Sequence, residues 1–183
     1  MKIPRINPET WDAAAGLMAN TIDVKRARGV RHPFHADPDA SLGVLRNEYD
    51  HFSARYYGAE VDEDIACNWF QAMAIITLDL GDHSEYLGDH SESASAVLPL
   101  LRSKMEDYGY DNIDRFGLDG ILVRLHDKIA RLENLWERGA EANNESLTDT
   151  HADIIGYCII GCMVAMDLWR LPLNDQFVHP SMR

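Results

Sequence analysis

The chain has 183 residues, enough for one hydrophobic core or for two small halves that share a core. Its 30 acidic residues outnumber its 17 Lys and Arg residues, and the formal net charge of −13 argues against a broad nucleic-acid interface, which needs a basic surface. The first residues lack the apolar segment of a secretory signal, and the most apolar run, residues 154–166, is too short to span a bilayer. We therefore expect a cytoplasmic protein that binds neither nucleic acid nor a membrane.

Helix-start and helix-stop signals divide the chain into six expected helices and predict an all-α fold. The clearest starts are Asn7-Pro8 and Asp37-Pro38, because Asn and Asp cap helices and Pro suits the first helical position. Apolar residues recur at helical spacing, and no segment alternates with the period of two expected for a strand. The expected helices cover residues 8–29, 41–57, 62–80, 93–108, 118–138 and 146–170.

The last two expected helices carry charged residues that point to a binding site. Four residues of the helix at 118–138 are spaced so that they project from one face: Arg124, Asp127, Lys128 and Arg131. Three acidic residues spaced four apart follow: Glu145, Asp149 and Asp153. If the two helices pack antiparallel, carboxylates and cationic groups come together, which is the chemistry that holds a divalent metal and a phosphate chain.

Three motifs lie in order within residues 107–157, namely DYGYDN, RFGLDGILVRLHDKIARL and ESLTDTHADIIGY. The segment from about residue 100 to 165 resembles the nucleotide modification associated domain of small phage and bacterial proteins, which is similar to the all-α NTP pyrophosphatase (MazG-like and dimeric dUTPase) superfamily. The resemblance implies a MazG-like helical bundle, completed by internal duplication or by assembly into a dimer or tetramer. It also implies Mg²⁺-dependent hydrolysis of a nucleoside triphosphate to a monophosphate and pyrophosphate.

The resemblance assigns roles to the charged residues. The ligands of Mg²⁺ or Mn²⁺ would be Asp127, Glu145, Asp149 and Asp153. The phosphate chain would be held by Arg124, Lys128 and Arg131. The turn before them would contact the nucleotide through Asp107, Tyr108 and Asn112.

Structural roles for the same residues remain open. Ser146 and Asp149 also match a capping box, and Asp127 has the spacing for salt bridges with Arg124 and Arg131 on its own helix. Asp153 differs, because it lies in an apolar run where an unpaired carboxylate would be costly. A metal ion or an arginine is therefore expected near Asp153.

The N-terminal half resembles the superfamily more weakly, through RHPFHADPDASLGVLRNEYDHF at residues 31–52. Asn47, Glu48 and His51 stand where the superfamily has a Glu-Glu-x-x-Glu metal motif, so two of three carboxylates are absent. We interpret residues 1–92 as a degenerate MazG-like half that completes the core, and residues 93–183 as the pyrophosphatase-like half.

Two alternatives follow from these departures. The chain is either a pyrophosphohydrolase or a non-catalytic helical protein, which would bind a nucleotide or a partner or serve as an accessory subunit in phage nucleotide modification. An exact repeat, LGDHSE at residues 80–85 and 87–92, has the composition of a metal site but also that of a solvated acidic connector.

Overall fold

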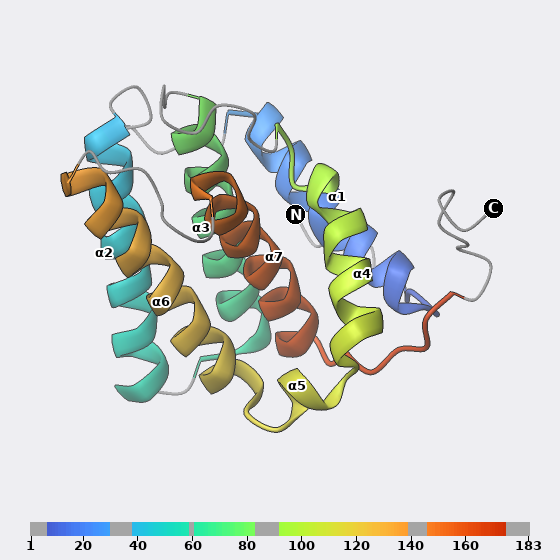
Figure 1. Cartoon of the computed structure of the whole chain (residues 1–183). Coiled ribbons are helices and arrows are strands. Elements are labelled where there is room, and N and C mark those ends of the chain that lie inside the picture. Colours follow the sequence, from blue (N-terminus) through green and yellow to red (C-terminus); the bar gives the residue numbers. More distant parts are fainter. Residues whose placement is uncertain (1–6, 30–37, 59–60, 83–91, 139–145, 175–183) are drawn as a thin grey trace.

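The computed structural model describes residues 7–29, 38–58, 61–82, 92–138 and 146–174, and these form a helical bundle (Figure 1). The described residues contain no strand, so the all-α prediction is confirmed. In chain order the elements are α1 (Trp11–Ala27), α2 (Pro38–Gly58), α3 (Glu63–Asp82), the 3-10 turn η1 (Ser95–Val97), α4 (Leu98–Tyr108), α5 (Asp111–Asp114), α6 (Gly117–Arg138) and α7 (Leu147–Ala165).

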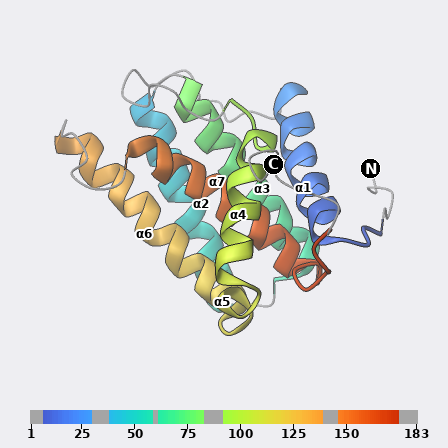
Figure 2. The same cartoon turned by 45° about the vertical axis from the view of Figure 1, so that its right-hand side comes forward.

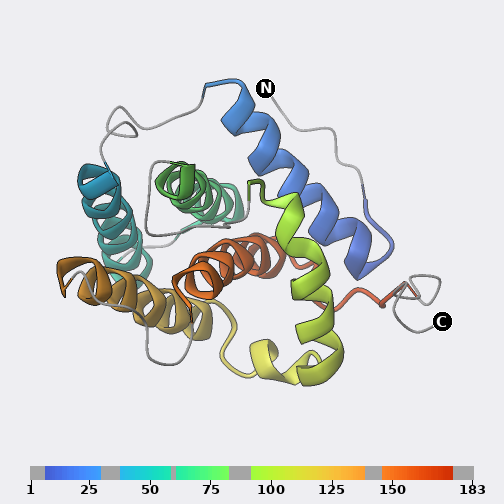
Figure 3. The ribbon, with the colours of Figure 1, turned by 45° about the horizontal axis from the view of Figure 1, so that its top comes forward.

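Helix α7 is the central element of the bundle. It packs against α3, α6, α1 and η1, and Figure 3 shows it surrounded by the other long helices. Nearly every residue from Thr150 to Met163 is buried, because this segment is apolar around its whole circumference. The apolar run that is too short for a membrane span is therefore the core helix of the protein.

Two glycines of α7 face neighbouring helices. A Cβ atom on Gly161 would lie 2.7 Å from the ring of Phe70 in α3, a distance that no real contact tolerates. A Cβ atom on Gly156 would lie 3.4 Å from Leu101 of α4. Gly161 is therefore required for the close approach of α7 to α3, whereas the contact of Gly156 with α4 is an ordinary one.

Several predicted helix ends differ from the structure. Helix α1 begins at Trp11 rather than Pro8, because the Thr10 hydroxyl accepts a hydrogen bond from Ala13 N (3.3 Å) and caps the helix there. Helix α7 ends at Ala165, ahead of the predicted end at residue 170, because Asp167 adopts a left-handed conformation (φ 57°). The single turn α5 was predicted as part of a loop.

The segment that follows α7 returns to the start of α1. Trp11 N donates to Pro172 O (2.8 Å), and Asn174 N donates to a carboxylate oxygen of Asp12 (2.7 Å). On the other side, the hydroxyl of Tyr110 donates to Leu171 O (2.6 Å). Residues 168–174, which we call the C-terminal strap, therefore bind α1 to the turn before α5.

The hydrophobic core draws on both halves of the chain, from Trp11 in α1 to Trp169 in the strap. In the N-terminal half, Glu48 accepts a hydrogen bond from the indole Nε1 of Trp69 (3.1 Å), and Phe52 stacks on the same indole. The contacts of Trp69 with Glu48 and Phe52 agree with a packing role for the first half.

Among the described residues, none of the helices combines the length and the apolarity needed to cross a membrane.

Candidate functional site

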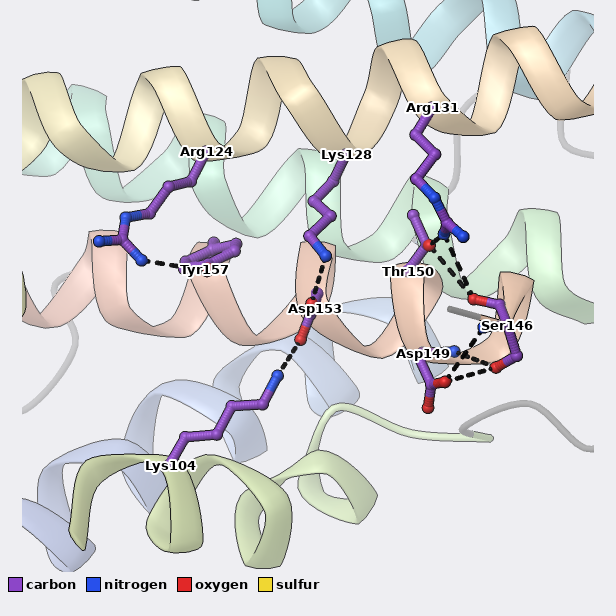
Figure 4. Close-up of polar contacts among 9 residues, drawn as sticks. All are labelled: Lys104, Arg124, Lys128, Arg131, Ser146, Asp149, Thr150, Asp153 and Tyr157. Atoms are coloured by element: carbon purple, nitrogen blue, oxygen red, sulfur yellow. Dashed lines mark hydrogen bonds and ion pairs between the residues drawn. The ribbon is translucent and has the colours of Figure 1, made fainter. Parts of the chain in front are cut away.

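The cationic face of α6 meets α7 along an antiparallel seam. Lys128 Nζ lies 2.7 Å from Asp153 Oδ2, at the middle of the seam (Figure 4). At one end Arg124 donates to the hydroxyl of Tyr157 (3.4 Å), and at the other end Arg131 binds the Thr150 hydroxyl and Ser146 O. The three cations therefore lie one helical turn apart along α7, as the sequence predicted.

Asp153 is the central carboxylate of this seam. Its side chain is 9% exposed, and Lys104 of α4 binds the oxygen that Lys128 leaves open (Figure 4). Burial alone would raise the pKa of this carboxyl group, but the hydrogen bonds and charges of Lys104 and Lys128 outweigh burial and hold the pKa below its usual range. Asp153 therefore has cationic partners, but the described ones are two lysines rather than the metal ion or arginine that the sequence predicted.

Sequence reasoning missed Lys104. Helix α4 crosses α7 on the side that α6 leaves uncovered, and this crossing brings Lys104 to Asp153 (Figure 2). The pattern of α4 offered one weak signal, since Leu100, Lys104 and Tyr108 are spaced four apart and share a face.

A cavity of about 330 Å³ opens between α4, α5, α6 and α7. Leu101, Met105 and Ile160 contribute to its apolar lining, and Trp169 of the C-terminal strap borders it. The polar lining includes Lys104, Arg124, Asn112, Asp153 and Tyr157. The volume falls within the range of small-molecule sites, about 300–1,000 Å³.

Two cationic side chains, Lys104 and Arg124, line this cavity. Among the described residues, Lys104 pairs with Asp153, whereas Arg124 has no acidic partner. Its guanidinium donates to Asn112 Oδ1 (2.6 Å) and lies over the Tyr157 ring, 5.8 Å from the centroid. These neutral partners fix its direction without neutralising its charge. Lys104 lines the same cavity, and Lys128 binds the other oxygen of Asp153 from outside the lining, so three positive charges surround the one carboxylate of Asp153. In a chain of net charge −13, this local excess favours an anion.

Two predicted site residues point away from the seam. Asp127 is 74% exposed and lies 3.8 Å from His126, so it does not face α7 as predicted. Adjacent helix residues are about 100° apart, and Lys128 takes the position that faces Asp153. Asp107 is likewise exposed and lies outside the cavity lining, whereas Tyr108 and Asn112 line it.

Asp149 caps α7. Its carboxylate accepts hydrogen bonds from Ser146 N (3.2 Å) and Ser146 Oγ (2.8 Å), and Asp149 N donates to Ser146 Oγ (3.0 Å). This is the capping box that the sequence offered as the structural alternative. Its carboxylate is exposed at the end of the seam, one turn from Asp153.

The remaining predicted ligand positions divide into two groups. Glu145 and positions 83–91 of the LGDHSE repeat lie outside the described residues. Asn47 and His51 are exposed on α2, and Glu48 is engaged with Trp69. Within the described ranges, no three His, Cys, Asp or Glu residues gather closely enough to hold a metal ion.

Comparisons of the chain with protein-family models, with curated proteins and with solved structures found no match.

Proposed function

We propose that the chain binds a nucleoside triphosphate at the cavity between α4, α6 and α7 and hydrolyses it to a monophosphate and pyrophosphate. The observation that carries the binding step is the local excess of positive charge, with Arg124 held by neutral partners at the wall of the cavity. Guanidinium and ammonium groups are the usual partners of phosphate oxygens. The hydrolytic step is proposed from the resemblance of residues 107–157 to NTP pyrophosphatases.

The geometry supports a defined division of labour for the cations. Arg124 has donors left after its bonds to Asn112 and Tyr157, because a guanidinium carries five N–H groups. Lys104 is half-exposed at the cavity, so its ammonium group can leave Asp153 and bind a phosphate oxygen. Lys128 is more buried and would keep Asp153 ionised when Lys104 moves.

The described residues do not by themselves make a magnesium site. Asp149 and Asp153 lie one turn apart on α7, but the first carboxylate caps the helix and the second binds two lysines. Mg²⁺ demands octahedral oxygen coordination and usually keeps several waters beside one or two carboxylates. Further oxygens would have to come from residues such as Glu145 or from the phosphates themselves.

The experiment that tests this function separates binding from turnover. The chain is titrated with each dNTP and NTP by isothermal calorimetry in EDTA, and pyrophosphate release is then followed after Mg²⁺ is added. We expect binding in both conditions and release only with Mg²⁺. Binding without release would favour the non-catalytic alternative, and absence of binding in both conditions would refute the proposal.

The non-catalytic alternative has one specific observation in its favour. Asp153, the best-placed carboxylate of the site, already has a charge partner on each oxygen. A protein that only holds a nucleotide needs nothing more than this positive cavity. In that case the function of the protein would be to bind the nucleotide, without a metal ion and without hydrolysis.

A further inference from the structure

The rim of the cavity has an apolar character that the phosphate-binding cations do not explain. Tyr108 is 67% exposed and Leu100 is 41% exposed, and both line the cavity from α4. They flank Lys104 by one helical turn on either side. A ligand that fills the cavity would therefore meet an apolar side chain on either side of Lys104.

We propose that Tyr108 stacks on the aromatic base of the bound nucleotide, so that the site selects an aromatic ring joined to a phosphate chain. This inference rests on the proposed nucleotide binding and goes beyond it, because cations alone would accept inorganic polyphosphate or a sugar phosphate equally well. The ring lies against Tyr108 at the rim and the phosphates lie toward Lys104 and Arg124.

The hydrogen-bonding groups of the cavity agree with this orientation. Arg124 occupies the Oδ1 atom of Asn112, so the two N–H donors of that amide remain for a ligand. An amide donor matches the carbonyl oxygens and ring nitrogens of a base. The apolar floor near Met105 and Ile160 would shield such a hydrogen bond from water.

The free energy of stacking sets the size of the expected effect. Stacking of a base on an aromatic side chain contributes about 1–3 kcal/mol on truncation to alanine, which corresponds to about 5- to 150-fold in Kd. Because Tyr108 is exposed, its truncation should leave the fold and the thermal midpoint unchanged.

The test compares ligands with and without a base in matched variants. Binding of a dNTP and of inorganic tripolyphosphate is measured by calorimetry in EDTA for the unchanged chain, Tyr108→Ala and Tyr108→Phe. Tyr57→Ala is the control, because Tyr57 is exposed to a similar degree (64%) and lies on α2, outside the cavity lining. We expect the dNTP to bind about 5- to 150-fold more tightly than tripolyphosphate, and Tyr108→Ala alone to remove that difference.

The outcomes distinguish this inference from the proposed function. Equal affinity for the dNTP and tripolyphosphate, or a difference that survives in Tyr108→Ala, would overturn the stacking role and leave phosphate binding in place. Failure of both ligands to bind the unchanged chain would overturn the proposed function and the stacking role with it. Loss of the difference in Tyr108→Phe as well would show that the hydroxyl, rather than the ring, contacts the ligand.

Discussion

Lys128 of α6 lies 2.7 Å from the carboxylate of Asp153 in α7, and this pair joins the two helices at the middle of the seam. Since Lys104 binds the same carboxylate from α4, Asp153 holds three helices together through one charged group. The carboxylate is nearly buried, so its charge depends on these two lysines.

Loss of Asp153 should affect turnover far more than loss of Asp127. If the chain is a metal-dependent pyrophosphohydrolase, Asp153→Asn should lower the rate by roughly 100-fold or more, since a lost ligand weakens both metal affinity and water activation. EDTA should abolish hydrolysis, and Mg²⁺ or Mn²⁺ should restore it. Asp127→Asn is the matched control, because that carboxylate is exposed on the outer side of α6. Near-normal pyrophosphate release by Asp153→Asn would contradict the role in hydrolysis.

Arg124 should contribute to ligand affinity rather than to stability. Arg124→Ala removes a charged donor from the cavity, so we expect the Kd for a dNTP to rise about 10- to 150-fold, the effect of losing hydrogen bonds worth about 1.5–3 kcal/mol. Arg28→Ala, which removes the same charge from an exposed position after α1, should leave the Kd within about twofold. A lower melting temperature with unchanged Kd would instead assign Arg124 to a structural contact with Asn112 and Tyr157.

The stability that Asp153 provides should disappear in acid. Its folded pKa lies below the unfolded value of about 3.9, so its contribution is present at all pH values above that and is lost as pH falls through the folded pKa. The difference in urea unfolding between the unchanged chain and Asp153→Asn should therefore be constant between pH 5 and 8 and should shrink progressively as the pH falls below about 4. A difference that persists unchanged into acid would mean that the ionised form is not the stabilising one.

The capping box allows the two roles of Asp149 to be separated. Ser146→Ala removes the cap of α7 and should cost about 1 kcal/mol of unfolding free energy. Asp149→Asn keeps an acceptor oxygen for Ser146, so its stability should stay within about 0.5 kcal/mol of the unchanged chain. If turnover nevertheless falls strongly in Asp149→Asn, the carboxylate also binds metal. If turnover is unchanged in Asp149→Asn, the role of Asp149 is limited to the capping box of α7.

The N-terminal half should support the fold and leave the chemistry unaffected. Glu48→Gln keeps an acceptor for the indole of Trp69, so turnover should stay within about twofold. Trp69→Ala removes a large, partly buried ring stacked on Phe52 and should cost about 3 kcal/mol, the lower end of the range for such truncations. Loss of activity in Glu48→Gln would show that both halves share one metal site.

The helices themselves were predictable because their signals are local. Proline at position 38, the acidic start of α3 and the apolar stripe of α6 each mark structure within a few residues, and the structure has those helices there. The antiparallel match of Arg124, Lys128 and Arg131 with α7 was also predictable, since one short connection limits how two long helices pack.

The parts of the site that were missed depend on tertiary packing. Lys104 reaches Asp153 across 49 positions of sequence, and nothing near either residue specifies how α4 crosses α7. The prediction that Asp127 faces α7 was wrong. Helix residues three and four apart spread over a wide arc of the helix surface, and only the position of α7 decides which of them face it. The early end of α7 was not predictable either, because the residue with the left-handed conformation is Asp167 and not a glycine.

The C-terminal strap connects the wall of the cavity to a helix that does not line it. Trp169 borders the cavity, and three residues later Pro172 accepts the backbone hydrogen bond of Trp11 at the start of α1. A ligand that holds Trp169 in place would lower the probability that this strap opens, and opening of the strap frees the first turn of α1. Amide hydrogen exchange at Trp11 should therefore slow when the cavity is filled. A helix that never touches the ligand would in this way report its presence.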